Sequence, residues 1–416
     1  MVERVRRRVV ITGVGAITPI GLAADGLWDG LRAQRSKVRE ISRFDPALFR
    51  SRLAAQVDDF VPGDFLEAKR MKRLDRFGQF SVAAARLALE DSDIDLAGED
   101  RERIGAMMGT ALGGVGYAEE QCSVFYTGSV KDVDPALALM VFGGASSCNI
   151  AIEFGVMGPN STNAMSCASG TIAIGEAFRQ IRDGYADVML GGGAEAPLYP
   201  LCYGAFALIR AMSTRNDDPC TASRPFDRDR DGFVMGEGAS VLVLEERSRA
   251  IARGAKIYGE VAGFGMSNDA YHMTAPRPDG SQAARSMRRA LEDAGVSADE
   301  VGYVNAHGSS TPLNDSTETL AIKQVFGERA YSVPVSGTKG YYGHASGASG
   351  AIEAGICALA MTNDWLPPTV NLANADEKCD LDYIKRVGRP SCPEVILSNS
   401  FGFGGINAAL VFRRNN

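Results

Sequence analysis

Histidine is scarce in this sequence, and the residue patterns that bind structural metals or form disulfide frameworks are missing. The 416 residues include only three histidines, and the eight cysteines contain no C-x-x-C pair and no zinc-like spacing. Cysteines scattered in this way predict free, reduced thiols, as are usual in cytoplasmic proteins. We therefore expect a cytoplasmic protein without a metal site.

Long apolar runs, a surplus of positive charge and a phosphate-binding loop are also missing. No stretch of about 18 uninterrupted apolar residues occurs, which argues against a helix that spans a membrane. The net charge of −7 argues against a protein built mainly to bind nucleic acid. The motif G-x-x-x-x-G-K-[ST] does not occur. We expect binding to neither membranes nor nucleic acid, and any basic docking surface must be local.

What the sequence does contain is an alternation of strand-like and helix-like segments. Segments such as 74–92 and 281–295 repeat apolar residues at helical spacing. Short β-branched or apolar runs, which predict strands, lie near the N-terminus and at 103–109, 186–193, 239–246, 257–265, 301–308, 334–340 and 394–414. The alternation predicts an α/β fold with a mostly parallel or mixed sheet. Because a single core rarely grows beyond about 250–300 residues, we predict two similar halves, residues 1–255 and 256–416.

One cysteine stands out by its surroundings. Cys167 lies in MSCASG, after a small and polar stretch and before a helix-like pattern that reaches about residue 182. This position predicts a sulfur at a helix N-terminus, where backbone N–H groups and the helix dipole stabilise a thiolate. Cys148, Cys202 and Cys357 lie in apolar surroundings, and we interpret them as small buried hydrophobic residues.

Two of the three histidines follow predicted strands in polar, glycine-rich segments. His307 lies in VNAHGSSTPLND, and His344 lies in GTKGYYGHASGASG with Lys339 five positions before it. Residues on strand-end loops can project into a cleft, so these three are candidates for catalysis. His272, in SNDAYHMTAPRPDG, is a weaker candidate that either shapes a tunnel mouth or caps a loop.

These blocks, together with the closing NSFGFGGIN, resemble the signatures of the beta-ketoacyl-acyl-carrier-protein synthase family, closest to the type II elongation enzymes. The resemblance runs through almost the whole chain. It implies a thiolase fold with duplicated halves in five αβαβα layers, and a homodimer. It also implies decarboxylative condensation of malonyl-carrier protein with an acyl chain on Cys167. No cofactor of the chain's own is implied, since phosphopantetheine arrives on the acyl-carrier protein.

The resemblance assigns roles to residues around the reaction. His307 and His344 are implied to donate hydrogen bonds to the malonyl thioester oxygen, and which histidine does what is left open. Lys339, paired with Glu353, is implied to organise the histidines electrostatically. The backbone amides of Cys167 and Phe403 would form the oxyanion hole. Phe401 and Phe403 would gate the entry of the acyl chain.

Two further sets of residues follow from the resemblance. Ser309, in place of the usual threonine, and Thr311 are expected to bind the phosphopantetheine arm through their hydroxyl groups. Contacts with an acidic carrier protein are expected from Lys69, Lys72, Arg73 and Arg210. A solvated helix face is an equally good interpretation of any one of these charges.

Several positions depart from a housekeeping fatty acid synthase of this type. They are Leu112, Met165, Tyr341 and Tyr342, and we expect them to reshape the acyl pocket. The departures favour a specialised synthase, for example in a polyene or polyketide pathway, over compensated repacking in an ordinary elongase. A biosynthetic thiolase would use a second cysteine near its C-terminus, and a chalcone-synthase-like enzyme would use asparagine in place of the second histidine. A further possibility is a synthase subunit that needs a chain-length-factor-like partner in a heterodimer.

Overall fold

The computed structural model describes residues 6–415; residues 1–5 and 416, the ends of the two predicted halves, lie outside the described part. The described chain is built around an 11-stranded mixed sheet. Its strands are β1 (Val9–Thr18), β2 (Gly21–Leu22), β5 (Ile104–Gly109), β6 (Asn160–Asn163), β7 (Val188–Glu195), β9 (Gly238–Glu246), β10 (Gly259–Asn268), β11 (Tyr303–Ala306), β12 (Val335–Gly337), β15 (Val395–Gly402) and β16 (Ile406–Arg413).

The strand order shows an internal repeat. One part of the sheet runs β6-β5-β7-β9-β1 and the other runs β12-β11-β15-β16-β10. In both parts the first three strands are parallel and the next two pair antiparallel. The two parts meet where β1 and β10 pair antiparallel. The predicted division after residue 255 falls between the helix at Arg247–Ala252 and β10, and this boundary stays a prediction.

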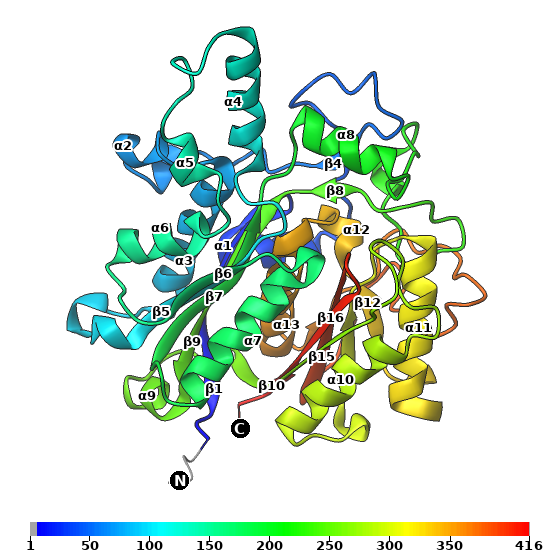
Figure 1. Cartoon of the computed structure of the whole chain (residues 1–416). Coiled ribbons are helices and arrows are strands. Elements are labelled where there is room, and N and C mark those ends of the chain that lie inside the picture. The colour runs from blue at the N-terminus through cyan, green and yellow to red at the C-terminus, as the bar shows by residue number, and fades with distance from the viewer. Residues whose placement is uncertain (1–5, 416) are drawn as a thin grey trace.

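Helices cover both parts of the sheet and also separate them. They are α1 (Ala23–Arg32), α2 (Ala68–Met71), α3 (Arg76–Ser92), α4 (Val115–Thr127), α5 (Leu137–Met140), α6 (Ala145–Phe154), α7 (Ser169–Arg182), α8 (Pro200–Leu208), α9 (Arg247–Ala252), α10 (Ser281–Ala294), α11 (Pro312–Phe326), α12 (Lys339–Tyr342) and α13 (Ser349–Thr362). Figure 1 shows α3 and α6 to one side, α10 and α11 to the other, and α7 and α13 in the middle. Both central helices contact strands of both parts. The predicted αβαβα layering is confirmed.

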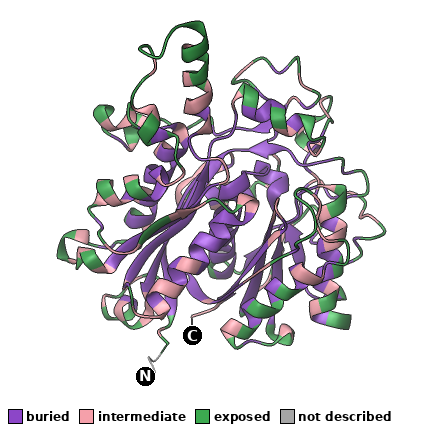
Figure 2. Cartoon of the chain, in the orientation of Figure 1, coloured by how far each residue is buried: buried purple, intermediate pink, exposed green. Residues whose placement is uncertain are grey.

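The central layer is almost completely buried. In α13 every residue except Thr362 is buried, and the central strands are buried on both faces (Figure 2). Burial on all sides explains why α13 is mostly apolar, with Ser349 and Glu353 as buried polar exceptions. Small residues let α7 and α13 approach each other, since a Cβ on Gly170 would lie 2.8 Å from the Ala351 nitrogen. The N-terminal ends of the two helices therefore lie close together.

β1 and β10, the strands at which the two parts meet, each contact an outer helix at a glycine. A Cβ on Gly15 in β1 would lie 1.9 Å from the Ala84 carbonyl oxygen in α3. In β10, a Cβ on Gly265 would lie 2.2 Å from the Ser286 carbonyl oxygen in α10. These contacts explain the glycines within the two strands, because a side chain there would meet the backbone of the helix.

The other predicted elements can be compared directly. The segments at 74–92 and 281–295 form α3 and α10, and 394–414 forms β15 and β16 joined by a glycine-rich turn. The edge strand β6 was missed, because its sequence Asn-Ser-Thr-Asn has no apolar alternation. Two small sheets complete the fold, one of β3 (Arg39–Glu40), β4 (Leu53–Ala55) and β8 (Met235–Gly236), the other of β13 (Trp365–Leu366) and β14 (Arg389–Pro390). Among residues 6–415, no helix combines the length and apolarity that crossing a membrane requires.

Candidate active site

Cys167 lies in a tight turn at the head of a central helix. The turn is the 3-10 segment η4 (Ser166–Ala168), directly before α7. Ser166 has a φ of +53°, which is uncommon for a residue with a side chain and turns the chain sharply just before the nucleophile. The Ser169 hydroxyl holds this turn by donating to the Ser166 carbonyl at 2.7 Å. Cys167 is a partly exposed residue that lines a cavity, as a nucleophile that meets a substrate must.

Two influences disfavour the Cys167 thiolate, burial and the charge of Glu195, and three contacts favour it. Burial of the sulfur raises the pKa of the Cys167 thiol above its ordinary value. The Ser166 hydroxyl, the charge of Lys339 and the backbone N–H of Phe403 all lower this pKa. The net direction is the reverse of the one expected from the helix N-terminus alone. Burial thus disfavours deprotonation overall, and the contacts that oppose burial include one from a distant loop.

His307 is held in place through its backbone and its ring. It follows β11, and its N–H donates to Glu318 Oε1 at 2.8 Å, while the N–H of Gly308 donates to Oε2 at 2.9 Å. Lys339 Nζ lies 3.4 Å from His307 Nδ1 and donates to the His307 carbonyl at 2.6 Å. With Nδ1 facing an ammonium group, Nε2 carries the proton of the neutral ring.

His344 lies opposite His307 at nearly a right angle. The two ring centroids are 5.3 Å apart and the ring planes meet at 83°. His344 Nδ1 is 2.8 Å from Ser349 Oγ, and the His344 N–H donates to the Val234 carbonyl at 2.7 Å. The second histidine is thus fixed by the first residue of α13 and by the chain before β8.

Both imidazoles are neutral at ordinary pH. Burial lowers the pKa of His307 and of His344 well below the usual value, and the charge of Lys339 lowers both further. The side chains of Lys339 and Glu353 are fully buried and form an ion pair. Burial raises the pKa of Glu353, and Lys339 opposes that effect. A neutral ring can donate one N–H to an oxyanion without first losing a proton.

A cavity of about 370 Å³ brings these groups together. Its lining includes Cys167, His307, His344, Phe401 and Phe403. The Phe403 ring stacks on Phe206 of α8, with ring centroids 6.4 Å apart, and Phe401 lies 5.8 Å from His307. A thiol, two neutral N–H donors and a backbone N–H that points at the sulfur can together bind and stabilise a reacting thioester.

Comparison with known proteins identifies the family. Residues 6–250 match the family model of the beta-ketoacyl synthase N-terminal domain, and residues 258–373 match that of the C-terminal domain. The chain belongs to the beta-ketoacyl synthase family. The family predicted from the sequence motifs is thereby confirmed.

The similarity to individual family members extends over the full length. The 3-oxoacyl-[acyl-carrier-protein] synthase 2 of Synechocystis sp. is 47% identical, with 98% of each chain covered. The tetracenomycin polyketide synthase ketoacyl synthase alpha subunit of Streptomyces glaucescens is 44% identical, covering 100% of this chain and 99% of that protein. The solved ishigamide ketosynthase/chain length factor is 36% identical with a TM-score of 0.93, covering 99% of this chain and 100% of that one. The predicted thiolase-type ketosynthase fold is thus confirmed.

The residues predicted to bind the phosphopantetheine arm lie at the same cavity of this beta-ketoacyl synthase. Ser309 and Thr311 both line it, and their hydroxyl oxygens are 2.9 Å apart. Thr311 also accepts a hydrogen bond from the Asn314 N–H and so caps α11. Arg210 lines the cavity as well and is exposed.

The four departures from the housekeeping pattern lie outside this cavity lining. Tyr341 and Tyr342 are fully buried in the core, and the Tyr342 hydroxyl is 2.9 Å from Thr338 Oγ1. The Met165 side chain is 43% exposed, and the Leu112 N–H donates to a buried glutamate. None of the four lines the cavity around Cys167, so their role in acyl binding stays a prediction.

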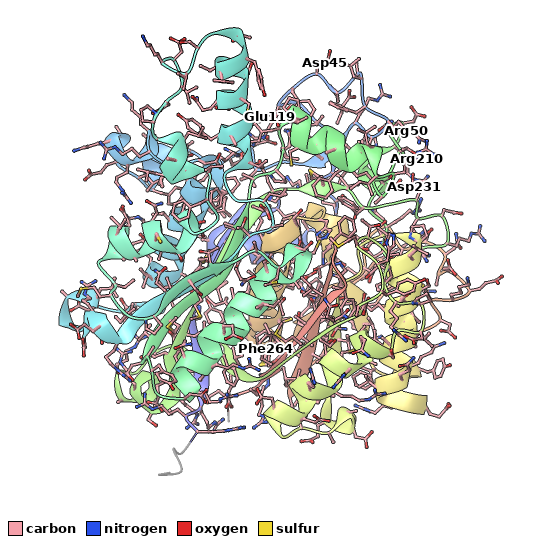
Figure 3. The ribbon with its side chains drawn as sticks, in the orientation of Figure 1. Asp45, Arg50, Glu119, Arg210, Asp231 and Phe264 are labelled. Carbon is pink, nitrogen blue, oxygen red and sulfur yellow. The ribbon has the colours of Figure 1, made fainter. Side chains whose placement is uncertain are left out.

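The four basic residues predicted to contact the carrier do not form one patch within a single chain. Lys69, Lys72 and Arg73 are exposed on and just after α2. Figure 3 labels Arg210 near the end of α8, whereas Figure 1 places α2 at the opposite side of the molecule. The sequence analysis grouped these four residues only through the family resemblance. Their role in docking the carrier stays a prediction.

Some residues were interpreted wrongly or missed. Cys148 is exposed, whereas Cys202 and Cys357 are buried as predicted. His272 is exposed, and its Nδ1 accepts hydrogen bonds from the Thr274 and Ala275 N–H groups, which is the loop-capping alternative. Glu318 was missed; it lies in α11, for which no helix was predicted, and it binds the backbone at His307 and Gly308.

Proposed function

We propose that this chain is a 3-oxoacyl-[acyl-carrier-protein] synthase that extends an acyl chain by two carbons through decarboxylative condensation with malonyl-carrier protein. The observation that carries the proposal is a single cavity holding Cys167, the Phe403 N–H and two neutral, perpendicular histidines. The enzyme needs no cofactor of its own, because the phosphopantetheine arm belongs to the carrier. We place the reaction in the cytoplasm.

The first step is transfer of the acyl group to the enzyme. The sulfur of Cys167 attacks the thioester carbonyl of the acyl carrier, and the carrier thiol leaves after taking up the proton. The N–H groups of Cys167 and Phe403 stabilise the tetrahedral oxyanion. Phe401 and Phe403 gate access, and the stacking of Phe403 on Phe206 supports this role. Ser309 and Thr311 hold the arm by hydrogen bonds.

The second step generates the carbon nucleophile. Malonyl-carrier protein enters, the bond to its carboxylate carbon breaks, CO2 leaves, and the electron pair forms an enolate on the thioester. His307 and His344 donate N–H groups to the enolate oxygen. Lys339 and Glu353 keep the rings oriented and neutral. The enolate carbon then attacks the acyl carbonyl on Cys167, and the cysteine sulfur leaves as the 3-oxoacyl product forms.

The pathway and the partners follow from the relatives and from the altered positions. We propose a specialised polyene or polyketide pathway, supported by the likeness to a polyketide alpha subunit and to the ishigamide ketosynthase/chain length factor. Leu112, Met165, Tyr341 and Tyr342 would tune the acyl pocket from outside the cavity lining. The chain assembles as a homodimer or with a chain-length-factor-like subunit, and it docks the carrier through Lys69, Lys72, Arg73 and Arg210. Ordinary fatty acid elongation is the second candidate, favoured by the 47% identical relative.

Intact-mass spectrometry tests the proposal directly. Wild type and Cys167→Ala are incubated with carrier proteins that bear short, long and polyunsaturated chains, followed by malonyl-carrier protein. We expect an acyl adduct on the wild type alone and a product two carbons longer, and the preferred chain distinguishes the two pathways. If no chain gives an adduct, a second run with a co-expressed partner subunit decides between a heterodimer and a wrong function.

A further inference from the structure

Glu195 is a buried carboxylate that the proposed reaction does not use. It is the last residue of β7 and is fully buried. Its Oε1 accepts hydrogen bonds from Thr110 Oγ1 at 2.9 Å and from the Leu112 N–H at 3.1 Å. Its Oε2 accepts from the N–H groups of Ala111 at 2.6 Å and Gly347 at 2.9 Å. None of these four donors carries a charge, so neutral dipoles alone form a cradle for the anion.

The cradle joins the two segments that carry the reacting groups. Gly347 lies in the 3-10 turn η8 (Ser346–Ala348), between His344 and Ser349. The segment that begins at Thr110 is tied to the nucleophile turn, because the Thr110 carbonyl accepts a hydrogen bond from Ser169 Oγ at 2.9 Å. A shift of η8 away from Thr110 would therefore move His344 relative to Cys167.

The turn η8 and the segment that begins at Thr110 are in very close contact. A Cβ on Gly347 would lie 2.4 Å from the Ala111 nitrogen, closer than two such atoms can approach. Two backbone N–H groups that converge this closely can both be satisfied by one carboxylate oxygen, and here Oε2 of Glu195 accepts both. Without an acceptor at that point, both N–H groups would be left buried and unpaired, which costs free energy for each.

The internal repeat explains why a cradle exists there. The turn η8 precedes α13 as η4 precedes α7, and Gly347 is the middle residue of η8 as Cys167 is of η4. The residue before each has a positive φ, +53° at Ser166 and +42° at Ser346. Glu195 ends β7, the strand whose place in the repeat matches that of β15. The cradle is the second copy of the place where an oxyanion would be stabilised beside Cys167.

We propose that Glu195 is a positioning residue whose carboxylate occupies this second anion cradle and so fixes η8, with His344 and Ser349, relative to Cys167. The proposal rests on the proposed function for its catalytic consequence, and on the geometry alone for the cradle. The 14-residue helix α13 adds the positive end of its dipole to the cradle. Burial raises the pKa of Glu195 to about 7, while the four hydrogen bonds favour the ionised form. An ionised carboxylate accepts all four bonds, whereas a protonated one would turn its O–H toward an N–H.

Removal of the side chain with chemical rescue tests the proposal. In Glu195→Ala the three N–H groups and the Thr110 hydroxyl remain, and sodium formate can supply a carboxylate of the right size. We expect malonyl-carrier protein decarboxylation to fall about 100-fold, the usual cost of a misplacement of about 1 Å at a catalytic group. Acylation of Cys167, followed by intact mass, should fall much less. Formate should restore most of the decarboxylation rate and raise the Tm of the variant, but not that of wild type.

A matched control is another buried glutamate, Glu245, the last residue but one of β9. It is fully buried too, and it pairs with Arg249 and Arg253 rather than with backbone N–H groups. Glu245→Ala should lose stability without any gain of activity or Tm from formate. If Glu195→Ala does not fold, Glu195→Gln keeps the volume, turns an N–H toward the cradle and should still lose decarboxylation selectively.

The outcomes separate this proposal from the proposed function. Full decarboxylation activity in Glu195→Ala or Glu195→Gln would overturn the positioning role, as would a folded Glu195→Ala whose rate and Tm do not respond to formate. An equal loss of both half-reactions in Glu195→Ala would also overturn it, because a general loss of structure would then suffice. If wild type itself shows neither half-reaction, the proposed function fails, and the formate-dependent Tm still decides whether the cradle binds a carboxylate.

Discussion

The two central turns, η4 before α7 and η8 before α13, have matching backbones but different occupants. In η4 the middle residue is Cys167, which faces an open cavity and accepts a hydrogen bond from the Phe403 N–H. In η8 the middle residue is Gly347, and its N–H is already bound by Glu195. A duplicated fold therefore provides two equivalent places for an anion at helix N-termini. Side chains from neighbouring strands decide which place stays open to a substrate.

A second difference separates the loops that follow β5 and β11. The loop after β11 begins with His307, whose backbone is held by Glu318 so that its ring points into the cavity. The loop after β5 begins with Thr110, whose hydroxyl binds Glu195. Both loops are fixed by a buried carboxylate, but only the loop after β11 presents a titratable ring. The two rings thus come from the second part of the repeat, whereas the nucleophile Cys167 comes from the first.

The strongest test of the difference between η4 and η8 is to change the middle residue of each turn. Cys167→Ala should lower condensation by about 10³-fold or more, because the nucleophile is lost, while the free energy of unfolding stays near that of wild type. Gly347→Ala should lower the free energy of unfolding by about 1–3 kcal/mol, because its Cβ meets backbone atoms. Urea denaturation and product formation measure both. Equal stability losses in the two variants would show that the turns are not packed differently.

The next largest effect concerns the two histidines. His307→Ala and His344→Ala should each lower malonyl-carrier protein decarboxylation by about 10²–10³-fold, the cost of losing one oxyanion donor. Acylation of Cys167 should continue in both. His272→Ala is the matched control, since His272 caps an exposed loop and does not line the cavity. A His272 variant as slow as the other two would contradict the assignment.

A pH profile sharpens the role of the buried ion pair. In wild type the low pKa of both histidines keeps the rings neutral, so decarboxylation should persist as the pH falls through 6.5 and decline only below it. Lys339→Met removes a positive charge that disfavours protonation, so the pKa of His307 rises and the acid limb moves to higher pH. The double variant Lys339→Met/Glu353→Gln should show a smaller shift, because the unpaired carboxylate is removed too. An unchanged acid limb in Lys339→Met would refute the electrostatic role.

The smallest effect is expected at the surface. Arg210→Glu should raise the KM for acyl-carrier protein about fivefold at low salt with little change in kcat, which corresponds to about 1 kcal/mol for an exposed charge pair. Lys72→Glu, just after α2, gives the comparison from the other side of the chain. If both variants raise KM, the carrier contacts two regions too far apart in one chain, and a partner subunit must supply one of them. If neither does, the docking assignment is wrong.

Sequence patterns predicted the architecture wherever they were local. The apolar periodicity at 74–92 and 281–295 and the apolar runs before His307 and before residue 402 correspond to α3, α10, β11 and β15. The polar edge strand β6 escaped because it has no alternation to detect. Tyr341 and Tyr342 are a different case, since packing buries both in the core, outside the cavity lining, and their predicted effect on acyl binding stays a prediction.

The candidate site was predictable in its reacting groups but not in the groups that hold them. Cys167, His307, Lys339 and His344 stand in distinctive local motifs, and all of them were named from the sequence. Nothing local marks Glu195 as a ligand of Gly347, because 152 positions separate them along the chain. The Phe403 N–H, which reaches Cys167 from the turn between the last two strands, was named only through the family resemblance.

The sequence by itself determined the alternating α/β layers, the family and the reactive side chains, because periodicity and short motifs depend on neighbouring residues. Tertiary structure decided how those side chains behave. It set the direction of the Cys167 pKa through burial, kept the two histidines neutral through burial and Lys339, and closed the second anion cradle with Glu195. These properties depend on desolvation and on contacts between distant segments, which exist only once the chain has folded.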